Sequence, residues 1–117
     1  MSPSGAEVIR KIRSQVEEVD PSEVREHLGN GVVLVDVRES EEWDAGHIPG
    51  SLHRPYHGIR ELPERLDPGR PIAAICGSGQ RSAVAASLLK RFGAHEVIHV
   101  VDGGVPLWKR EGWPTEA

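Results

Sequence analysis

Hydrophobic residues along the chain form three short runs. They lie at residues 32–35 with Val37, at 71–75, and at 97–101, where His99 is the one polar residue. Runs of this length, rich in Val and Ile, are typical of central parallel strands that are buried on both faces. Helix signals lie between the runs, and this alternation predicts a parallel sheet with helices on both faces. We therefore expect an α/β domain.

Helix signals occur before, between and after these runs. Ser4 and Glu7 form a capping-box pattern, and apolar residues at helical spacing follow, so we expect an amphipathic helix over residues 5–18. A capping Asp followed by Pro predicts a second helix over residues 20–28. Further helices are expected from Ser40, over 58–66, over 81–92 and over 105–110.

The composition is typical of a small globular domain. The 117 residues are 38% hydrophobic and 27% charged, but only 4% aromatic, so Val, Ile, Leu and Ala must fill the core. A chain of this length usually forms one domain. We divide it into an N-terminal helical extension over residues 1–18 and a domain over residues 19–117.

Charge, hydropathy and cysteine content argue against several classes of protein. The formal net charge of -4 argues against a general nucleic-acid binder. No run approaches the ~18 consecutive apolar residues of a membrane helix, and the N-terminal residues lack a secretory signal pattern, so we expect a cytoplasmic protein with no membrane partner. The single cysteine, Cys76, excludes an intramolecular disulfide and a multi-cysteine zinc site.

The candidate chemistry lies in the loop after the second strand, Cys76-Gly77-Ser78-Gly79-Gln80-Arg81-Ser82. The thiol follows the carboxyl end of a predicted parallel strand, where open α/β sheets bind ligands. The small residues after it allow successive backbone N–H groups to turn toward one point, and the next helix adds its positive end. Both effects favour the thiolate, so we expect the pKa of Cys76 to lie below the free value of about 8.5. Arg81 would add a fixed positive charge for an oxyanion.

Simpler interpretations of these residues compete with the functional one. A lone buried cysteine is usually a small hydrophobic residue, and a glycine-rich loop is often only a tight connection. The combination of thiol, glycines, arginine and strand-to-helix placement favours a functional site. The histidines do not add a metal site, because Pro55 separates His53 from His57, and His95 and His99 merely flank a strand.

Four motifs follow one another along the chain. They are Asp36-Val37-Arg38, the stretch from Glu42 to Ser51 that contains Gly46-His47-Ile48-Pro49-Gly50, the cysteine loop, and Gly103-Gly104-Val105-Pro106-Leu107-Trp108. In this order and at this spacing they resemble the rhodanese-like domain family, in single-domain form. The resemblance covers roughly residues 18–114. It implies a doubly wound, mostly parallel five-stranded sheet with helices on both faces.

The resemblance also implies that Cys76 is a catalytic nucleophile in two half-reactions. Its thiolate would take sulfane sulfur from thiosulfate or a persulfide donor and pass it, from a Cys76 persulfide, to a thiol or cyanide acceptor. A sulfur-accepting protein is a further candidate partner, and no metal or organic cofactor is required. The loop amides and the Arg81 cation would bind the donor and the anionic sulfur, and this loop consists of Gly77, Ser78, Gly79, Gln80 and Arg81.

Loop length favours sulfur transfer within this resemblance. Four residues lie between Cys76 and Arg81, as in rhodanese-like sulfurtransferases, whereas the related phosphatases have one more. The shorter ring of amides fits a single sulfur on cysteine better than a phosphate. Gly77 and Ser78 are neutral at positions where thiosulfate-specialised members tend to carry basic side chains. We therefore expect activity with thiosulfate, but with a high KM.

Three residues are expected to support the site. Asp36 and Arg38 would brace the surrounding loops by ion pairing, and Ser82 would either cap the helix after the loop or hydrogen-bond the thiolate. His47, in the turn between Gly46 and Gly50, is expected to be a hydrogen-bonded turn residue rather than a base, because a thiolate stabilised by amides needs none.

Two other kinds of function use the same loop and stay open. A non-catalytic or regulatory sulfur-relay module would accept a persulfide from a partner protein and show negligible turnover of small donors. A phosphatase or arsenate reductase would direct the same thiolate at an oxyanion. The short loop argues against the phosphatase, and the lack of a second cysteine prevents an intramolecular resolving disulfide in the reductase.

Overall fold

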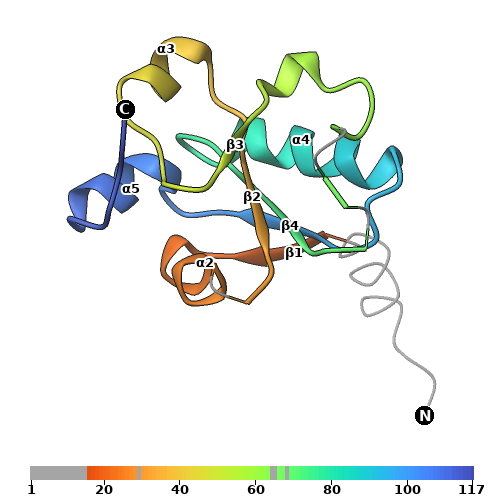
Figure 1. Cartoon of the computed structure of the whole chain (residues 1–117), viewed down its shortest axis with the longest axis horizontal. Helices are drawn as coiled ribbons and strands as arrows, with labels where there is room; N and C mark the ends of the chain where they lie inside the picture. Colours follow the sequence, from red (N-terminus) through yellow and green to blue (C-terminus); the bar gives the residue numbers. More distant parts are fainter. Residues whose placement is uncertain (1–15, 29, 64–65, 68) are drawn as a thin grey trace.

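A five-stranded parallel sheet forms the centre of the protein (Figure 1). The computed structural model describes residues 16–117, except for residues 29, 64–65 and 68. The strands are β1 (Val16–Val19), β2 (Val33–Asp36), β3 (Leu52–His53), β4 (Ile72–Ile75) and β5 (Val97–Val100), in the order β1-β5-β4-β2-β3. Every neighbouring pair is parallel, so the carboxyl ends of the strands share one edge of the sheet.

Helices cover both faces of this sheet, and α2 and α4 lie on opposite sides of it in Figure 1. They are α2 (Pro21–His27), α3 (Ser40–Asp44), α4 (Gln80–Arg91) and α5 (Gly104–Arg110), with a short 3-10 helix η1 (Tyr56–Gly58). The predicted α/β fold with a parallel five-stranded sheet is confirmed. Within the part of the chain described, no helix is long and apolar enough to cross a membrane.

Alternating side chains of the central strands build a separate core on each face. Along β2, Leu34 packs with the residues of α2 and α5, whereas Val35 packs with those of α4. The same alternation along β4 directs Ile75 to the α2 and α5 side, and Cys76 beyond it to the α4 side. The thiol therefore lies beside the first turn of α4, the helix that follows it in the chain.

The predicted helix over residues 5–18 is wrong at its C-terminal end. Residues 16–18 belong to β1, which pairs with β5 in the register Val16 to Val97 and Val19 to Val100. Pairing with the exposed edge of β5 overrides a local spacing that also suits a helix. Residues 16–18 therefore lie in the same sheet as the other strands. The rest of that predicted helix lies outside the described residues.

The predicted helix over residues 58–66 is also wrong where the structure describes it. The 3-10 helix ends at Gly58, and Ile59 then adopts an extended backbone conformation. Pro63 disfavours a helical conformation at the residue before it, which explains why the helix does not continue. Strand β3 has no counterpart in the expected elements, because two residues are too few to form a recognisable pattern.

Candidate active site

The loop after β4 wraps the sulfur of Cys76 in backbone N–H groups. The amide of Gly79 donates to Sγ at 3.0 Å, and the amide of Ser82 donates at 3.3 Å. The hydroxyl of Ser82 lies 3.4 Å from Sγ, where it accepts from the thiol or donates to the thiolate. Cys76 is fully buried. Although aliphatic residues pack around it, the sulfur faces polar donors from its own loop and from the first turn of α4.

Gly79 gives the loop the backbone conformation that this arrangement needs. It is the N-cap of α4 and has a φ of +97°, in the left-handed region that favours glycine. Its carbonyl oxygen accepts from the Ser82 hydroxyl at 3.2 Å and lies 2.7 Å from Nε2 of His99. His99 is buried beneath the loop, and its Nδ1 lies 3.7 Å from the carboxylate of Glu18. From the sequence, His99 is expected only to flank a strand, and its contact with the carbonyl oxygen of Gly79 is not predicted.

The N-terminus of α5 holds the loop from the other side. The amide of Val105 donates to the carbonyl oxygen of Cys76 at 2.9 Å. Gly104 has a φ of +51°, and a Cβ atom placed on it would lie 1.9 Å from that same carbonyl oxygen. Only glycine fits here, so the Gly103-Gly104 motif allows α5 to approach the backbone of the candidate nucleophile.

These contacts shift the pKa of Cys76 in two opposing directions. Burial, the largest single effect, raises the pKa because it penalises the charged thiolate. Hydrogen bonds from the Ser82 hydroxyl and from the backbone amides of Ser78, Ser82 and Gly79 lower it. Together the hydrogen bonds outweigh burial, and the pKa of Cys76 is lowered from its ordinary value of 9.0. The direction agrees with the one expected from the loop sequence.

The amides of residues 77–81 are expected to bind the donor and the terminal sulfur, and that role stays a prediction. Around Sγ itself, the amides of Gly79 and Ser82 donate at hydrogen-bond distance, and the amide of Ser78 also helps to lower the pKa of the thiol. Within the described loop, no hydrogen bond joins the amides of Gly77, Gln80 or Arg81 to Sγ. Of the two expected roles of Ser82, its contact with the sulfur is present, whereas no side chain caps α4.

Arg81 is engaged in an ion pair that sequence reasoning missed. Its two terminal nitrogens contact the carboxylate of Glu42 at 2.5 and 2.9 Å. Glu42 belongs to α3, where its carboxylate also accepts from the backbone amide of Glu39 at 3.1 Å and completes a capping box. The hydrogen bond from Arg81 lowers the pKa of Glu42 to about 2, and the same bond raises the pKa of Arg81.

Asp36 and Arg38 form a second, buried ion pair at the carboxyl end of β2. The guanidinium of Arg38 contacts the Asp36 carboxylate at 2.7 Å and donates to the carbonyl oxygen of Gly46 at 2.9 Å. It thereby connects β2 to the turn that precedes β3. The backbone oxygen of Arg38 lies 2.8 Å from Nε2 of His53, so the pair also ties down β3. The geometry agrees with the bracing role expected for both residues, which stays a proposal.

His47 makes the contacts of a turn residue. Its ring stacks on Trp43 at 3.5 Å between centroids, and its Nδ1 lies 3.0 Å from the Trp43 carbonyl oxygen.

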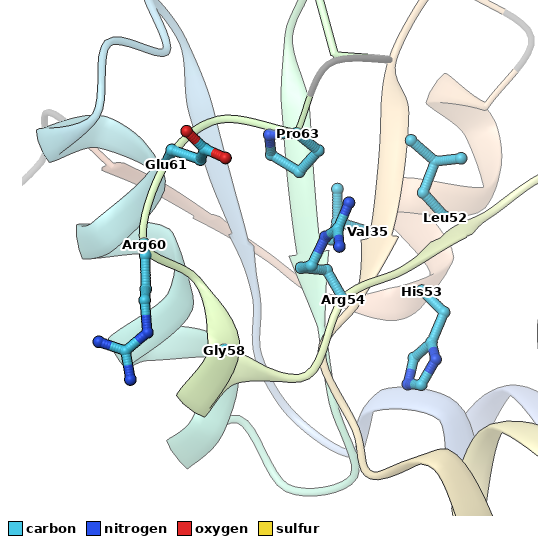
Figure 2. Close-up of a pocket in the computed structure, with 8 residues that line it drawn as sticks. All are labelled: Val35, Leu52, His53, Arg54, Gly58, Arg60, Glu61 and Pro63. Carbon is cyan, nitrogen blue, oxygen red and sulfur yellow. The ribbon is translucent and has the colours of Figure 1, made fainter.

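Elsewhere, Figure 2 shows Arg54 and Arg60 around a cavity of about 590 Å³ between β3 and residues 58–63. In the described residues, no hydrogen bond or ion pair joins either arginine side chain to the cysteine loop, and no group of three or more His, Cys, Asp or Glu is placed to hold a metal ion.

Comparison with known proteins identifies the family of this chain. The family model of the Rhodanese-like domain matches residues 20–111. The chain belongs to the rhodanese-like domain family. This assignment agrees with the fold, since the cysteine loop joins β4 to α4 at the carboxyl edge of the sheet.

Relatives within the rhodanese-like family cover most of the chain. The thiosulfate sulfurtransferase GlpE of Ectopseudomonas mendocina is 34% identical over 103 residues, which cover 88% of this chain and 93% of that protein. The YrkF protein of Bacillus subtilis, named as a proposed sulfur carrier protein, is 41% identical over 70 residues, 60% of this chain and 38% of that protein.

Solved structures of rhodanese-like proteins have the same fold. The crystal structure of a rhodanese-related protein from Thermoplasma volcanium superposes with a TM-score of 0.73 and 31% identity, covering 86% of this chain and 97% of that one. A rhodanese-like domain protein from Staphylococcus aureus gives a TM-score of 0.73 at 26% identity, covering 87% and 100%.

Proposed function

We propose that this protein is a sulfurtransferase that moves sulfane sulfur through a persulfide on Cys76. The observation that carries the proposal is the pair of backbone amides, from Gly79 and Ser82, that donate to Sγ within a short loop. These donors lower the pKa of the thiol and are already oriented toward a negative charge on sulfur. The relatives named thiosulfate sulfurtransferase support the same reaction class.

The first half-reaction charges the enzyme with sulfur. The Cys76 thiolate attacks the outer sulfur of thiosulfate, a new S–S bond forms on Cys76, and the S–S bond of the donor breaks. Sulfite leaves with the electron pair of the broken bond, and the terminal sulfur on Cys76 carries the negative charge. With a persulfide donor, the leaving group is a thiolate. The loop amides stabilise the charge on the terminal sulfur as it develops.

The second half-reaction discharges the enzyme. A thiol or cyanide attacks the terminal sulfur, takes it as a persulfide or thiocyanate, and releases Cys76 as the thiolate. Each step transfers one sulfur atom at the sulfane level, and the electron pair of the broken S–S bond goes to the leaving group, so neither step calls for an external oxidant, reductant or redox cofactor. We place this reaction in the cytoplasm, where reduced thiols are available as acceptors.

A second candidate function is supported by the match to YrkF. In a sulfur-relay module, Cys76 would receive sulfur from a persulfide on a partner protein and pass it on, with negligible turnover of small donors. The same loop would serve both functions, because the amides bind the terminal sulfur whatever its source.

Intact-mass spectrometry tests the proposal. The protein is mixed with thiosulfate alone, and we expect a one-sulfur adduct that cyanide removes and that the Cys76→Ser variant does not form. No adduct from thiosulfate or from a small alkyl persulfide, but one from a persulfidated protein, would support the relay instead. Hydrolysis of an aryl phosphate that depends on Cys76 would overturn both functions in favour of a phosphatase.

A further inference from the structure

The cation at the entrance to the cysteine loop is already occupied by a carboxylate. Arg81 contacts both oxygens of Glu42, in an arrangement that uses the two terminal nitrogens of the guanidinium. The arginine side chain is 25% exposed and the glutamate 38%, so the pair lies at the surface of the site rather than inside the protein. We call Glu42 and Arg81 the rim pair.

The rim pair lies directly against the residue that follows the nucleophile. A Cβ atom placed on Gly77 would be 3.1 Å from Nη2 of Arg81 and 3.7 Å from Oε2 of Glu42. The hydrogen bond and the charge of Glu42 raise the pKa of Arg81 and burial lowers it, while the negative charge on Cys76 is close enough to add a smaller rise. A donor that reaches Cys76 therefore approaches a carboxylate as well as a guanidinium.

Apart from Arg81, no described residue of the cysteine loop carries a positive charge that would offset the Glu42 carboxylate. Gly77, Ser78 and Gln80 are neutral, and the nearby Arg38 is held by Asp36 and by the carbonyl oxygen of Gly46. Glu42 is also held in place, because turning it away would break its hydrogen bond from the Glu39 amide. The positive charge of Arg81 is therefore neutralised by Glu42, whereas the loop sequence alone predicts a free cation at this position.

We propose that Glu42 is a specificity-determining residue that disfavours dianionic sulfur donors and favours persulfides whose reacting end carries less negative charge. This inference rests on the proposed sulfur transfer and deepens it. Thiosulfate carries two negative charges close to its outer sulfur, and the fixed Glu42 carboxylate cancels most of the attraction that Arg81 would otherwise exert on them. An alkyl persulfide carries at most one negative charge on its outer sulfur, and none in the protonated form R–S–SH that a thiolate attacks. The Cys76 thiolate attacks that sulfur, RS⁻ leaves, and Cys76 becomes the persulfide.

The Glu42→Gln variant tests this inference. Glutamine keeps an oxygen that accepts from the Glu39 amide and from Arg81, but it removes the negative charge. We expect kcat/KM for thiosulfate to rise about tenfold, since an exposed charge a few ångströms away is partly screened by solvent. The monoanion methanethiosulfonate should gain less, about threefold, and cysteine persulfide should change by less than about twofold.

Glu41→Gln provides the matched control. Glu41 is the exposed neighbour of Glu42 in the first turn of α3, so its replacement removes the same charge from the same helix. We expect no change in kcat/KM for any of the three donors. An equal rise in both variants would contradict the inference, because it would reflect net charge alone rather than the rim pair.

A second readout does not depend on sulfur transfer. Iodoacetate and iodoacetamide are similar in size but differ by one negative charge, and both alkylate a thiolate. The alkylation rate of Cys76 with iodoacetate, divided by its rate with iodoacetamide, should rise about fivefold in Glu42→Gln and stay constant in Glu41→Gln. An unchanged ratio in Glu42→Gln would overturn the inference, since Glu42 would then exert no effect on an anion that approaches the sulfur.

The outcomes separate this inference from the proposed function. If wild-type protein takes up sulfur and Glu42→Gln gives the same or a lower kcat/KM for thiosulfate, the specificity role of Glu42 is wrong and sulfur transfer stands. If neither protein accepts sulfur from any of the three donors, the proposed function fails and the donor preference fails with it, even where the alkylation ratio rises.

Discussion

The inner part of the candidate site and its rim are built in different ways. The inner part consists of Cys76, Gly79 and Ser82, which lie within one strand–loop–helix unit and contact each other through backbone amides. The rim consists of Glu42 and Arg81, which come from α3 and α4 and are 39 residues apart in the chain. The two parts therefore have different roles in the proposed mechanism. The inner part stabilises negative charge on sulfur, and the rim sets the preference for the charge of the sulfur donor.

The inner part depends on one close backbone approach, which gives the largest expected effect. A Gly104→Ala change would place a methyl group 1.9 Å from the carbonyl oxygen of Cys76, at a φ of +51°. We expect thermal unfolding to show a loss of about 3 kcal/mol or more and sulfur transfer to be abolished. Gly112→Ala is the control, because Gly112 also has a positive φ but no atom within 4 Å of its Cβ position. This variant should lose only about 1 kcal/mol and keep its activity.

At the rim, variants that change the charge of Glu42 and Arg81 have the next largest expected effect. Arg81→Ala leaves Glu42 unpaired beside the loop, so the KM for thiosulfate should rise about tenfold. In the double variant Glu42→Gln/Arg81→Ala the rim is neutral again, and the KM should return to within about threefold of wild type. The steady-state KM of the double variant decides the point. If it stays as high as that of Arg81→Ala, Arg81 binds the donor directly and Glu42 does not control its charge.

Ser82→Ala should have a smaller effect, confined to the inner part. It removes the hydroxyl that lies 3.4 Å from Sγ but keeps the Ser82 amide, so the pKa of Cys76 should rise. The rate of sulfur uptake at pH 7 should fall about fivefold, as expected for one hydrogen bond of ~1 kcal/mol. Ser87→Ala, which removes an exposed hydroxyl from the same helix, is the control. Equal rates in both variants would show that the Ser82 hydroxyl does not stabilise the thiolate.

The smallest expected effect is the pH dependence of the rim pair. The pKa of Glu42 is lowered from 4.5 to about 2, so the pair stabilises the folded protein above pH 4.5 and this contribution is lost as the pH falls toward 2. Because both side chains are partly exposed, we expect about 1 kcal/mol at most. Urea unfolding of wild type and Glu42→Gln should therefore differ at neutral pH and converge in acid. A difference that persists unchanged at low pH would contradict this assignment.

Sequence reasoning is most successful where contacts are local. The buried runs in β2, β4 and β5, the start of α2 at Asp20 and Pro21, and the loop from Cys76 to Ser82 could all be predicted, because each depends on residues near one another in the chain. A total of five strands follows only from the family resemblance. The local spacing in β1 predicts a helix instead, since nothing nearby in the chain shows that the edge of β5 is free to pair with it.

The same limit applies to the site. The contacts of Glu42 with Arg81 and of His99 with Gly79 join residues 39 and 20 positions apart, and neither spacing has a local signal. Both residues lie in segments that the sequence does single out, Glu42 in a family motif and His99 in a predicted strand. A search for charged partners of Arg81 at the carboxyl edge of the sheet could have found Glu42, because α3 follows β2 at that edge.

Sulfur transfer through Cys76 depends on the ionisation of its thiol, which a direct titration measures. The ultraviolet absorbance of the thiolate, followed against pH in wild type with Cys76→Ser as the blank, gives the pKa of this thiol. We predict a midpoint below the ordinary value of 9.0, since the hydrogen bonds to the sulfur, including those from Gly79 and Ser82, outweigh the effect of burial. A midpoint at or above that value would contradict the proposed sulfur transfer, because the loop would then hold a thiol rather than a nucleophile.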